Sequence, residues 1–523
     1  MSVLSFLDRR HSVAGPGYSR WLVPPAALAI HLSIGQVYAF SVFKIPLTRV
    51  LGVTAPAPGD WSFPQLAWIF SIAIAFLGIS AAAFGRWLES AGPRKAMFAS
   101  ACCFGGGFLV AALGVRTHQL WLLYLGYGVL GGIGLGLGYI SPVSTLIKWF
   151  VDRPGMATGL AIMGFGGGAM IGSPLANALM AHFRSASGVG VAETFVAMGL
   201  LYFAFMMIGA FTIRVPPDGW KPAGYVPPAK PQRLVTTSNV DVETAWRTPQ
   251  FWLLWVVLCA NVTAGIGILE QASPMIQEMF RGRVSAAAAG GFVGLLSLFN
   301  MAGRFGWSTA SDYLGRKPTY LVFFALGIAL YVGVTFTGHT RLNSVTLFVA
   351  CCALIMTMYG GGFATIPAYL RDLFGTMHVS AIHGRLLTAW SAAGVLGPVL
   401  VNYLREAQLA RGVAPADAYT RVLYVMAALL AVGLVCNLLV RAVPERTLAR
   451  SAERVRAMTK RGATAFPGAA PDRDPHTDWE RPAAGGSELA HPGGRAGVAD
   501  ETNPDVPMTG TRRPVARDVP PEA

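Results

Sequence analysis

The chain has few charged residues. Only 13% of its 523 residues are charged, whereas 53% are hydrophobic. Soluble globular domains carry roughly 25% charged residues, so this composition excludes an ordinary soluble protein. The charge that is present is unequal in sign, with 41 Lys and Arg against 26 Asp and Glu. Because the basic residues are dispersed over many loops instead of forming one patch, we expect no nucleic-acid partner.

The sequence also lacks paired cysteines, because none of its six cysteines belongs to a CxxC motif. All of them fall in apolar segments, at Cys102, Cys103, Cys259, Cys351, Cys352 and Cys436. A disulfide framework or a metal site requires paired spacing or clustered ligands. No apolar segment combines a nucleophile with a base or a cluster of metal ligands, so neither an enzyme nor a metal site is expected.

Long apolar runs are what the chain has in abundance. Twelve segments of about 20 mostly apolar residues are long enough to cross a bilayer core about 30 Å thick. They span approximately residues 21–46, 63–84, 96–115, 120–144, 155–181, 192–213, 250–272, 287–311, 318–338, 343–370, 381–404 and 420–441. We therefore predict an all-α membrane protein with twelve transmembrane helices that contact the lipid bilayer.

One loop motif occurs twice. Gly85–Lys95 (GRWLESAGPRK) returns in altered form at Ser311–Lys317 (SDYLGRK), each time after the second apolar segment of a half. The acids of the two copies, Glu89 and Asp312, are 223 residues apart. Two similar halves around a central site are the architecture of a secondary transporter. We accordingly expect two six-helix bundles that face each other across one pathway.

Composition predicts the domain boundaries. The chain divides into a cytoplasmic N-terminus (1–20), an N-terminal bundle (21–213), a proline-rich cytoplasmic linker (214–249), a C-terminal bundle (250–441) and a mostly disordered cytoplasmic tail (442–523). Basic loops stay on the cytoplasmic side, which places both termini there. The first segment has no small-residue cleavage site, so we expect it to be retained. The tail is too polar to bury a core, apart from a short amphipathic helix expected at 445–461.

The repeated loops predict a gate on the cytoplasmic side. Glu89 and Asp312 lie at helix ends, where a carboxylate can pair with basic residues of the loop or cap the N-terminus of a neighbouring helix. Arg94 and Arg316 are the basic residues that we assign to this gate. The alternative is that the loops only determine topology. Orientation does not require the acids, however, and this favours gating.

Arg304 is the strongest candidate for a substrate-binding residue. It lies eight residues before Asp312, hence about 12 Å from the helix end at about 1.5 Å per residue. A guanidinium at that depth costs on the order of 3 kcal/mol unless an anion or water receives it. Asn300 and Ser297 share its helical face, and its planar fork matches a carboxylate. The alternative is a structural ion pair or bonds to backbone carbonyls.

Four more residues complete the predicted substrate site. His31 shares a helical face with Tyr38 and is either a proton carrier or a packing residue. Tyr38, Tyr359 and Trp390 lie near the centres of their segments, where tyrosine hydroxyls can donate to a carboxylate and the rings can exclude water. Ordinary packing is the alternative for each. Glu270, toward the outer end of its helix, is expected to lie in external water rather than to couple protons.

Three local strings carry a family resemblance. They are His31–Phe40 (HLSIGQVYAF), Gly159–Gly168 (GLAIMGFGGG) and Asn300–Asp312 (NMAGRFGWSTASD). Together with the repeated loop, they resemble the oxalate/formate antiporter family of the major facilitator superfamily, over roughly residues 21–441. This resemblance implies a carrier of small carboxylates in the bacterial inner membrane, which works by alternating access and without a cofactor.

The resemblance also bears on the substrate. In the oxalate exchangers of that family, an arginine of helix 8 and a lysine of helix 11 each receive one carboxylate. Arg304 matches the arginine, whereas helix 11 has no basic residue between Arg385 and Arg405. A dianion would keep an uncompensated charge in a low-dielectric site. We therefore predict a monocarboxylate of the formate, pyruvate or lactate type, carried by a monomer.

The sequence does not decide how transport is coupled or exclude other functions. The substrate is either exchanged or carried together with protons. A dicarboxylate exchanger is the first alternative. A multidrug exporter would need an acid within the membrane, and a sensor without flux would need an output domain.

Overall fold

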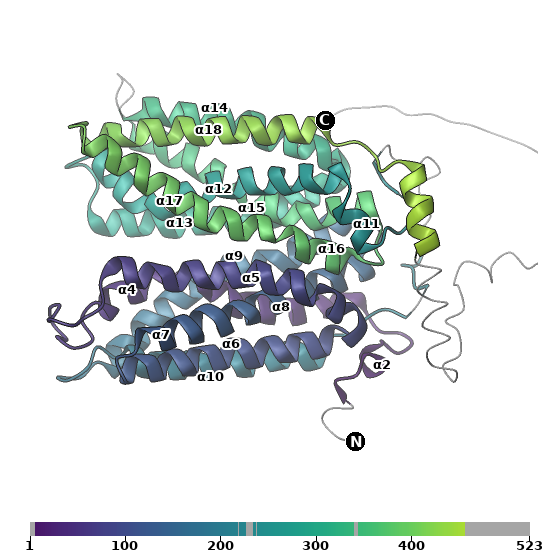
Figure 1. Ribbon diagram of the computed structural model, residues 1–523, viewed down its shortest axis with the longest axis horizontal. Coiled ribbons are helices and arrows are strands. Elements are labelled where there is room, and N and C mark those ends of the chain that lie inside the picture. The colour runs from purple at the N-terminus through teal and green to yellow at the C-terminus, as the bar shows by residue number, and fades with distance from the viewer. Residues whose placement is uncertain (1–5, 218, 226–233, 237, 339–343, 455–523) are drawn as a thin grey trace, which may run out of the picture. The chain divides into compact units, whose positions relative to one another are not determined.

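The described part of the chain is almost entirely α-helical. The computed structural model describes residues 6–217, 219–225, 234–236, 238–338 and 344–454. Within these ranges the only β-type pairings are two isolated bridges, one of which joins Val13 to Val215. The long helices run side by side along the horizontal axis of Figure 1. This architecture confirms the predicted all-α class.

The first half contains six long spans. The first span is composite, and consists of η1 (Arg20–Leu22), α3 (Val23–Ile34), η2 (Gly35–Ala39) and α4 (Ser41–Leu47). The other five are α5 (Phe63–Ala91), α6 (Pro93–Arg116), the run of α7 (Leu120–Leu123), η3 (Tyr124–Leu130) and α8 (Gly131–Trp149), α9 (Pro154–Phe183) and α10 (Val191–Thr212). A short helix, α2 (Arg9–Ser12), precedes them.

The second half repeats this plan. Its spans are α12 (Pro249–Met279), α13 (Ala286–Leu314), α14 (Arg316–Thr337), α15 (Val345–Phe374), the pair α16 (Val379–Leu386) and α17 (Thr388–Leu409), and α18 (Pro415–Leu439). In the described part of the chain, 11 helices are long and apolar enough to cross a membrane. The 29-residue α13 is the twelfth long span, so the predicted twelve-helix membrane fold is confirmed.

Glycine explains why the repeated loop turns so sharply. Gly92 follows α5 and Gly315 follows α13, and both have φ of +87°. Residues with a side chain rarely adopt this left-handed backbone conformation. Each glycine stands three residues after the acid of its loop. The motif therefore fixes the direction of the chain immediately after Glu89 and Asp312.

Glycine stripes also bring helices of one half together. Gly128, Gly132 and Gly136 face α5, and a Cβ at any of them would press against that helix. Gly168 of α9 faces the backbone of Gly35 in the first span. Lipid removes the hydrophobic drive between helices, so close backbone approach through small residues supplies the packing. These stripes therefore build the rigid scaffold of the first half.

The two halves touch through several pairs of helices. Helix α5 packs against α16 and α17, and α9 packs against α13. Gly85 faces Ala381, and Gly159 faces Ser308, so that a Cβ at either glycine would overlap the other half. We call the end of the bundle that holds the turns at Gly92 and Gly315 the linker end, and the opposite end the far end. The glycine contacts allow the halves to close tightly toward the linker end.

The proline-rich linker contains a helix that its composition did not predict. Val242–Trp246 forms the short helix α11, because Asp241 caps it by accepting bonds from the amides of Glu243 and Thr244. Residues 445–454 are helical, as expected for the amphipathic segment. Ser451 of this helix is bonded to Asp241. The remainder of the predicted helix and tail lies outside the described residues.

Candidate functional site

Arg304 is fully buried within α13. Its Nε donates to Asn300 Oδ1 at 3.0 Å, and its Nη1 donates to the carbonyl oxygen of Ile162 on α9 at 3.4 Å. Its Cζ lies 5.7 Å from the ring centroid of Phe165 and 5.2 Å from that of Phe363. Among the described residues, no carboxylate pairs with this guanidinium, and its Nη2 has no hydrogen-bond partner. Two of the three guanidinium nitrogens are therefore held by protein, and Nη2 is unused.

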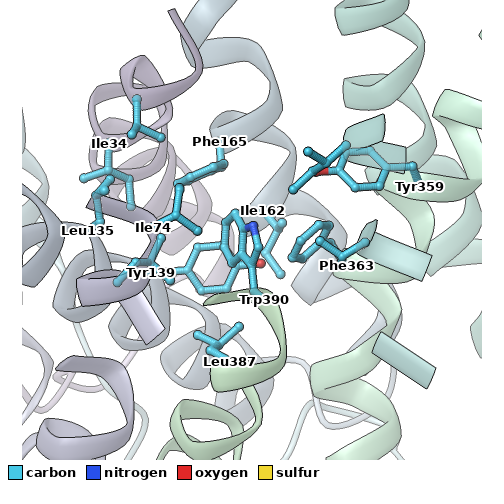
Figure 2. Packing of buried hydrophobic residues seen from close by; sticks show 14 of the residues in the cluster. Ile34, Ile74, Leu135, Tyr139, Ile162, Phe165, Tyr359, Phe363, Leu387 and Trp390 are labelled. Carbon is cyan, nitrogen blue, oxygen red and sulfur yellow. The ribbon is translucent and has the colours of Figure 1, made fainter. Parts of the chain in front are cut away.

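A cluster of aromatic rings from both halves adjoins Arg304. The aromatic cluster consists of Tyr38, Tyr139, Phe165, Tyr359, Phe363 and Trp390. Trp390 lies at its centre, with its ring centroid 4.4 Å from Phe363 and 5.3 Å from both Tyr139 and Phe165. Figure 2 shows Trp390 between Tyr139 of the first half and Phe363 of the second. The cluster is thus a contact surface between the two halves.

Two tyrosines bridge the halves beside Trp390. The hydroxyls of Tyr38 on η2 and Tyr359 on α15 share a hydrogen bond at 3.4 Å. The Tyr38 ring packs edge-on against Phe165, whose ring centroid lies 5.7 Å from the Arg304 Cζ. Tyr359 is buried, whereas Tyr38 is partly exposed. Of the predicted site residues, Arg304, Asn300, Tyr38, Tyr359 and Trp390 therefore gather in one region.

Unused hydrogen-bond donors concentrate in this region. Besides Arg304 Nη2, the indole Nε1 of Trp390 and the hydroxyl of Tyr139 are buried without a partner among the described residues. Roughly 90% or more of buried polar groups in native proteins are bonded, and an unbonded one costs about 1–3 kcal/mol. All three groups can donate. A guanidinium and two neutral donors at one aromatic cluster suit an anion with several acceptor oxygens, such as a carboxylate.

Two histidines flank Tyr139. The His31 ring on α3 lies 5.5 Å from Tyr139, and the His383 ring on α16 lies 5.9 Å from it on the side of the second half. Sequence reasoning identified His31 but missed His383, because the search for a cation in helix 11 began after Arg385. The side chain of Glu270 lies outside the described residues.

Asp312 joins the halves at the linker end. Its carboxylate accepts hydrogen bonds from the amides of Gly155 and Met156, at 2.8 Å each, and from Arg316 Nη2 at 2.6 Å. Gly155 and Met156 are in the first turn of α9, whose unpaired amides and dipole favour an anion. Arg316 also donates through Nε to Asp372 at 3.0 Å. Asp312 therefore holds α9 of the first half while Arg316 anchors it within the second.

Glu89 makes the reciprocal contact. Its Oε1 accepts from the amide of Ala381 at 3.2 Å, and its Oε2 lies 3.1 Å from His378 Nδ1. Ala381 belongs to the first turn of α16. Each acid of the repeated loop thus meets the start of a helix in the other half.

Among the described residues, the hydrogen bonds of Arg94 go to the N-terminal segment and to the end of α10, not to the other half. Its Nη1 donates to the carbonyl of Phe6 at 2.8 Å, and its Nη2 donates to the carbonyl of Ile213, at the end of α10, at 3.4 Å. Lys317 makes the equivalent contact in the second half, where it donates to the carbonyls of Leu438 and Val440 at the end of α18. These two basic residues therefore tie the helices of their own halves together. The gating role assigned to Arg94 stays a prediction.

The linker adds a contact that the motif did not indicate. Glu243 Oε1 accepts from Arg86 of α5 at 2.6 Å and from Arg385 of α16 at 2.5 Å. The hydrogen bond from Arg385, with the charges of Arg385 and Arg86, holds the pKa of Glu243 below its ordinary value. One linker carboxylate thus bridges the two halves at the linker end.

Phe165 and Phe363 are the other residues of the site that sequence reasoning missed. Each stands next to a run of glycines, in GFGGG and GGGF. Their contact with Arg304 depends on how α9, α13 and α15 pack together, which the glycine runs alone do not indicate.

Comparison with known proteins gives a consistent result. The family model described as Major Facilitator Superfamily matches residues 26–398. The chain is 28% identical over 388 residues to "Oxalate:formate antiporter" of Oxalobacter formigenes, covering 72% of this chain and 83% of that protein. It is 26% identical over 372 residues to "Uncharacterized MFS-type transporter YhjX" of Escherichia coli (strain K12), covering 70% and 83%. It is also 26% identical over 410 residues to "Monocarboxylate transporter 11" of Homo sapiens, covering 75% and 79%.

Among solved structures, FucP in the outward conformation is similar with a TM-score of 0.58 and 14% identity. The match covers 80% of this chain and 99% of that chain. At this identity the likeness shows the fold alone.

Proposed function

This chain belongs to the Major Facilitator Superfamily, and we propose that it is a secondary active transporter of small monocarboxylates of the formate, pyruvate or lactate type. The carboxylate binds Arg304, and the two halves rock around it so that the site opens to each side of the membrane in turn. The linker end faces the cytoplasm, and the membrane is the bacterial inner membrane.

The state of Arg304 is the observation that carries this proposal. A fully buried guanidinium has an unpartnered Nη2 and no carboxylate partner among the described residues. Intramembrane charge of this kind is costly and is typical of substrate pathways. A bound carboxylate would neutralise it through a charge-assisted bond to the unused Nη2. The donors of Trp390 and Tyr139 are available for its second oxygen or for a neighbouring keto or hydroxyl group.

The number of cations favours a single negative charge on the substrate. In the described aromatic cluster, Arg304 is the only Lys or Arg that contacts the rings from within the membrane-spanning helices. Helix α17 presents Trp390 to the cluster, not a lysine. A dianion would leave one charge without a permanent partner in a low-dielectric site. The names of the relatives fit a carboxylate, since they mention oxalate, formate and monocarboxylates.

The contacts at the linker end support alternating access. Asp312, Glu89 and Glu243 each bridge the halves there. In the proposed cycle these three bridges close the cytoplasmic side and must break before the substrate is released inward. Their interactions are polar, so a rocking motion can exchange them for bonds with water.

A competition experiment tests the proposed substrate class. Purified full-length protein in liposomes is offered one labelled monocarboxylate, with unlabelled formate, pyruvate, lactate, oxalate, succinate and a lipophilic cation as competitors. Competition by monocarboxylates alone supports the proposal. Competition confined to dicarboxylates would assign a dicarboxylate exchanger, and competition confined to the cation would assign a multidrug exporter.

A further inference from the structure

His31 and His383 come from opposite halves and bracket one ring. His31 is on α3 and His383 is on α16, and the ring of Tyr139 on α8 lies between them at 5.5 Å and 5.9 Å. Tyr139 is 5.3 Å from Trp390, which connects this group to the aromatic cluster. We call His31, Tyr139 and His383 the histidine bracket. It forms only where the two halves meet.

The polar atoms of the histidine bracket are buried and unused. His31 is 0% exposed and His383 is 2% exposed. Both ring nitrogens of His31, Nε2 of His383 and the hydroxyl of Tyr139 have no hydrogen-bond partner among the described residues. A histidine that serves only packing normally has its ring N–H bonded to a carbonyl or carboxylate. Burial without such a bond is therefore the signature of a group whose partner comes and goes.

Charged side chains near the bracket come from several elements. Arg304 of α13 reaches it through Phe165, whose ring centroid lies 5.7 Å from the Arg304 Cζ and 5.5 Å from that of Tyr139. On the elements packed against α16, Glu89 of α5 is bonded to His378 and Ala381, Glu243 of α11 to Arg385, and Asp372 of α15 to Arg316. Among these described acids, each is therefore engaged at the linker end. The two histidines are therefore the groups of the site that can take up a proton without breaking an ion pair.

We propose that the histidine bracket binds a proton that is carried together with the monocarboxylate, an inference that rests on the proposed function. The proton enters on a ring nitrogen of His383 or His31 from the side to which the site is open. It leaves from the same nitrogen on the other side. The proton is taken up and released without any change in the covalent bonds of the substrate.

The electrostatics make the two binding events cooperative. In the empty site, the charge of Arg304 opposes a second positive charge on a neighbouring histidine. A carboxylate on Arg304 cancels that charge, so protonation of the bracket becomes easier. By linkage, the proton raises the affinity for the carboxylate by the same factor. The carrier therefore loads both ions or neither, which is the requirement for symport.

Gradient-driven accumulation and equilibrium exchange separate this proposal from the proposed function. The protein is reconstituted at full length, with a labelled monocarboxylate and a pH-sensitive dye inside the liposomes. An inward proton gradient of about one unit can drive at most about tenfold accumulation when one proton accompanies each substrate. Exchange of internal for external substrate at equal pH requires no net proton movement.

His383→Gln and His31→Gln are the test variants, and His182→Gln, an exposed histidine at the far end of α9, is the matched control. We expect the wild type and His182→Gln to accumulate substrate and acidify the lumen. In His383→Gln we expect accumulation to fall to the level without a gradient, while exchange falls by no more than about threefold. In His31→Gln, which changes a residue of the predicted substrate site, we expect accumulation to be lost and exchange to fall as well. Thermal unfolding of each variant establishes that it is folded.

Three results would overturn the proton site. They are wild-type exchange without any response to the proton gradient, an equal fall of exchange and accumulation in both folded variants, and gradient-driven accumulation that persists in both. If the wild type exchanged no monocarboxylate at all, the proposed function itself would fail.

Discussion

Glu89 and Asp312 occupy equivalent positions in the two halves but have different basic partners. Asp312 pairs with Arg316 four residues later in its own half, whereas Glu89 lies against His378 of the opposite half. The reason is in the sequence, because Pro93 stands four residues after Glu89, where the second half has Arg316. Proline carries no charge, so the basic partner of Glu89 is supplied from across the interface.

Asp312→Asn should destabilise closure at the linker end. The amide keeps one acceptor for the α9 amides but loses the charge that pairs with Arg316. Charge-assisted bonds contribute about 1.5–3 kcal/mol, so the population with a separated linker end should rise by about tenfold or more. Spin labels on α5 and α16 measure this separation. Glu193→Gln is the control, since Glu193 pairs with Arg116 inside the first half. An unchanged distance distribution would remove Asp312 from the gate.

Closure should also depend on pH through Glu243. Its pKa is lowered by Arg385 and Arg86, so its contribution is present above the ordinary carboxyl pKa and is lost as the pH falls through the lowered value. The linker end should therefore open more readily under acid conditions than at neutral pH. Glu243→Gln should show the acid behaviour at neutral pH and little further change on acidification. The same spin-label distances, recorded against pH, measure this. A wild-type acid response that persists in Glu243→Gln would assign it to another group.

Asn300→Asp distinguishes a substrate-binding arginine from a structural one. Asn300 Oδ1 already accepts from Arg304 Nε at 3.0 Å, so the substitution places a permanent carboxylate beside the guanidinium with almost no change of shape. The internal ion pair should compete with the substrate and lower uptake by at least about tenfold. Asn300→Ser, which adds no charge, should retain more uptake. Thermal unfolding reports stability, which should not fall. Full uptake by Asn300→Asp would indicate that substrate does not use this guanidinium.

Trp390→Lys should change the substrate class. Trp390 lies in the helix that has no lysine and touches Phe363, Phe165 and Tyr139. A second cation there would compensate the second charge of a dianion, whereas a monoanion has no second charge to pair with it. We expect dicarboxylates to become competitors and monocarboxylate uptake to fall. Trp390→Phe, which keeps an aromatic wall, should keep the original preference. Competition profiles of both variants decide the matter, and unaltered selectivity in a folded Trp390→Lys protein would refute the charge-counting argument.

The long helices and the turns between them could be predicted from the sequence, since hydrophobic length and the glycine of the repeated loop act locally. Arg304 could be identified for the same reason, because burial of a charge follows from its depth in one helix. The partners across the interface could not be predicted. His378 meets Glu89, and Glu243 meets Arg86, only after the two halves dock.

The histidine bracket could not be predicted from the sequence either. His383 stands in a segment whose hydrophobic pattern gives no indication that it faces His31 and Tyr139. Its position depends on how α16 packs against α5 and α8. No helical periodicity within one segment contains that information.

Equilibrium binding of a labelled monocarboxylate to purified wild type and Arg304→Gln tests the central claim most directly. The account predicts saturable binding to the wild type, and at least about tenfold weaker binding to Arg304→Gln, with thermal unfolding showing that the variant is folded. Equal affinity in the two folded proteins would contradict it.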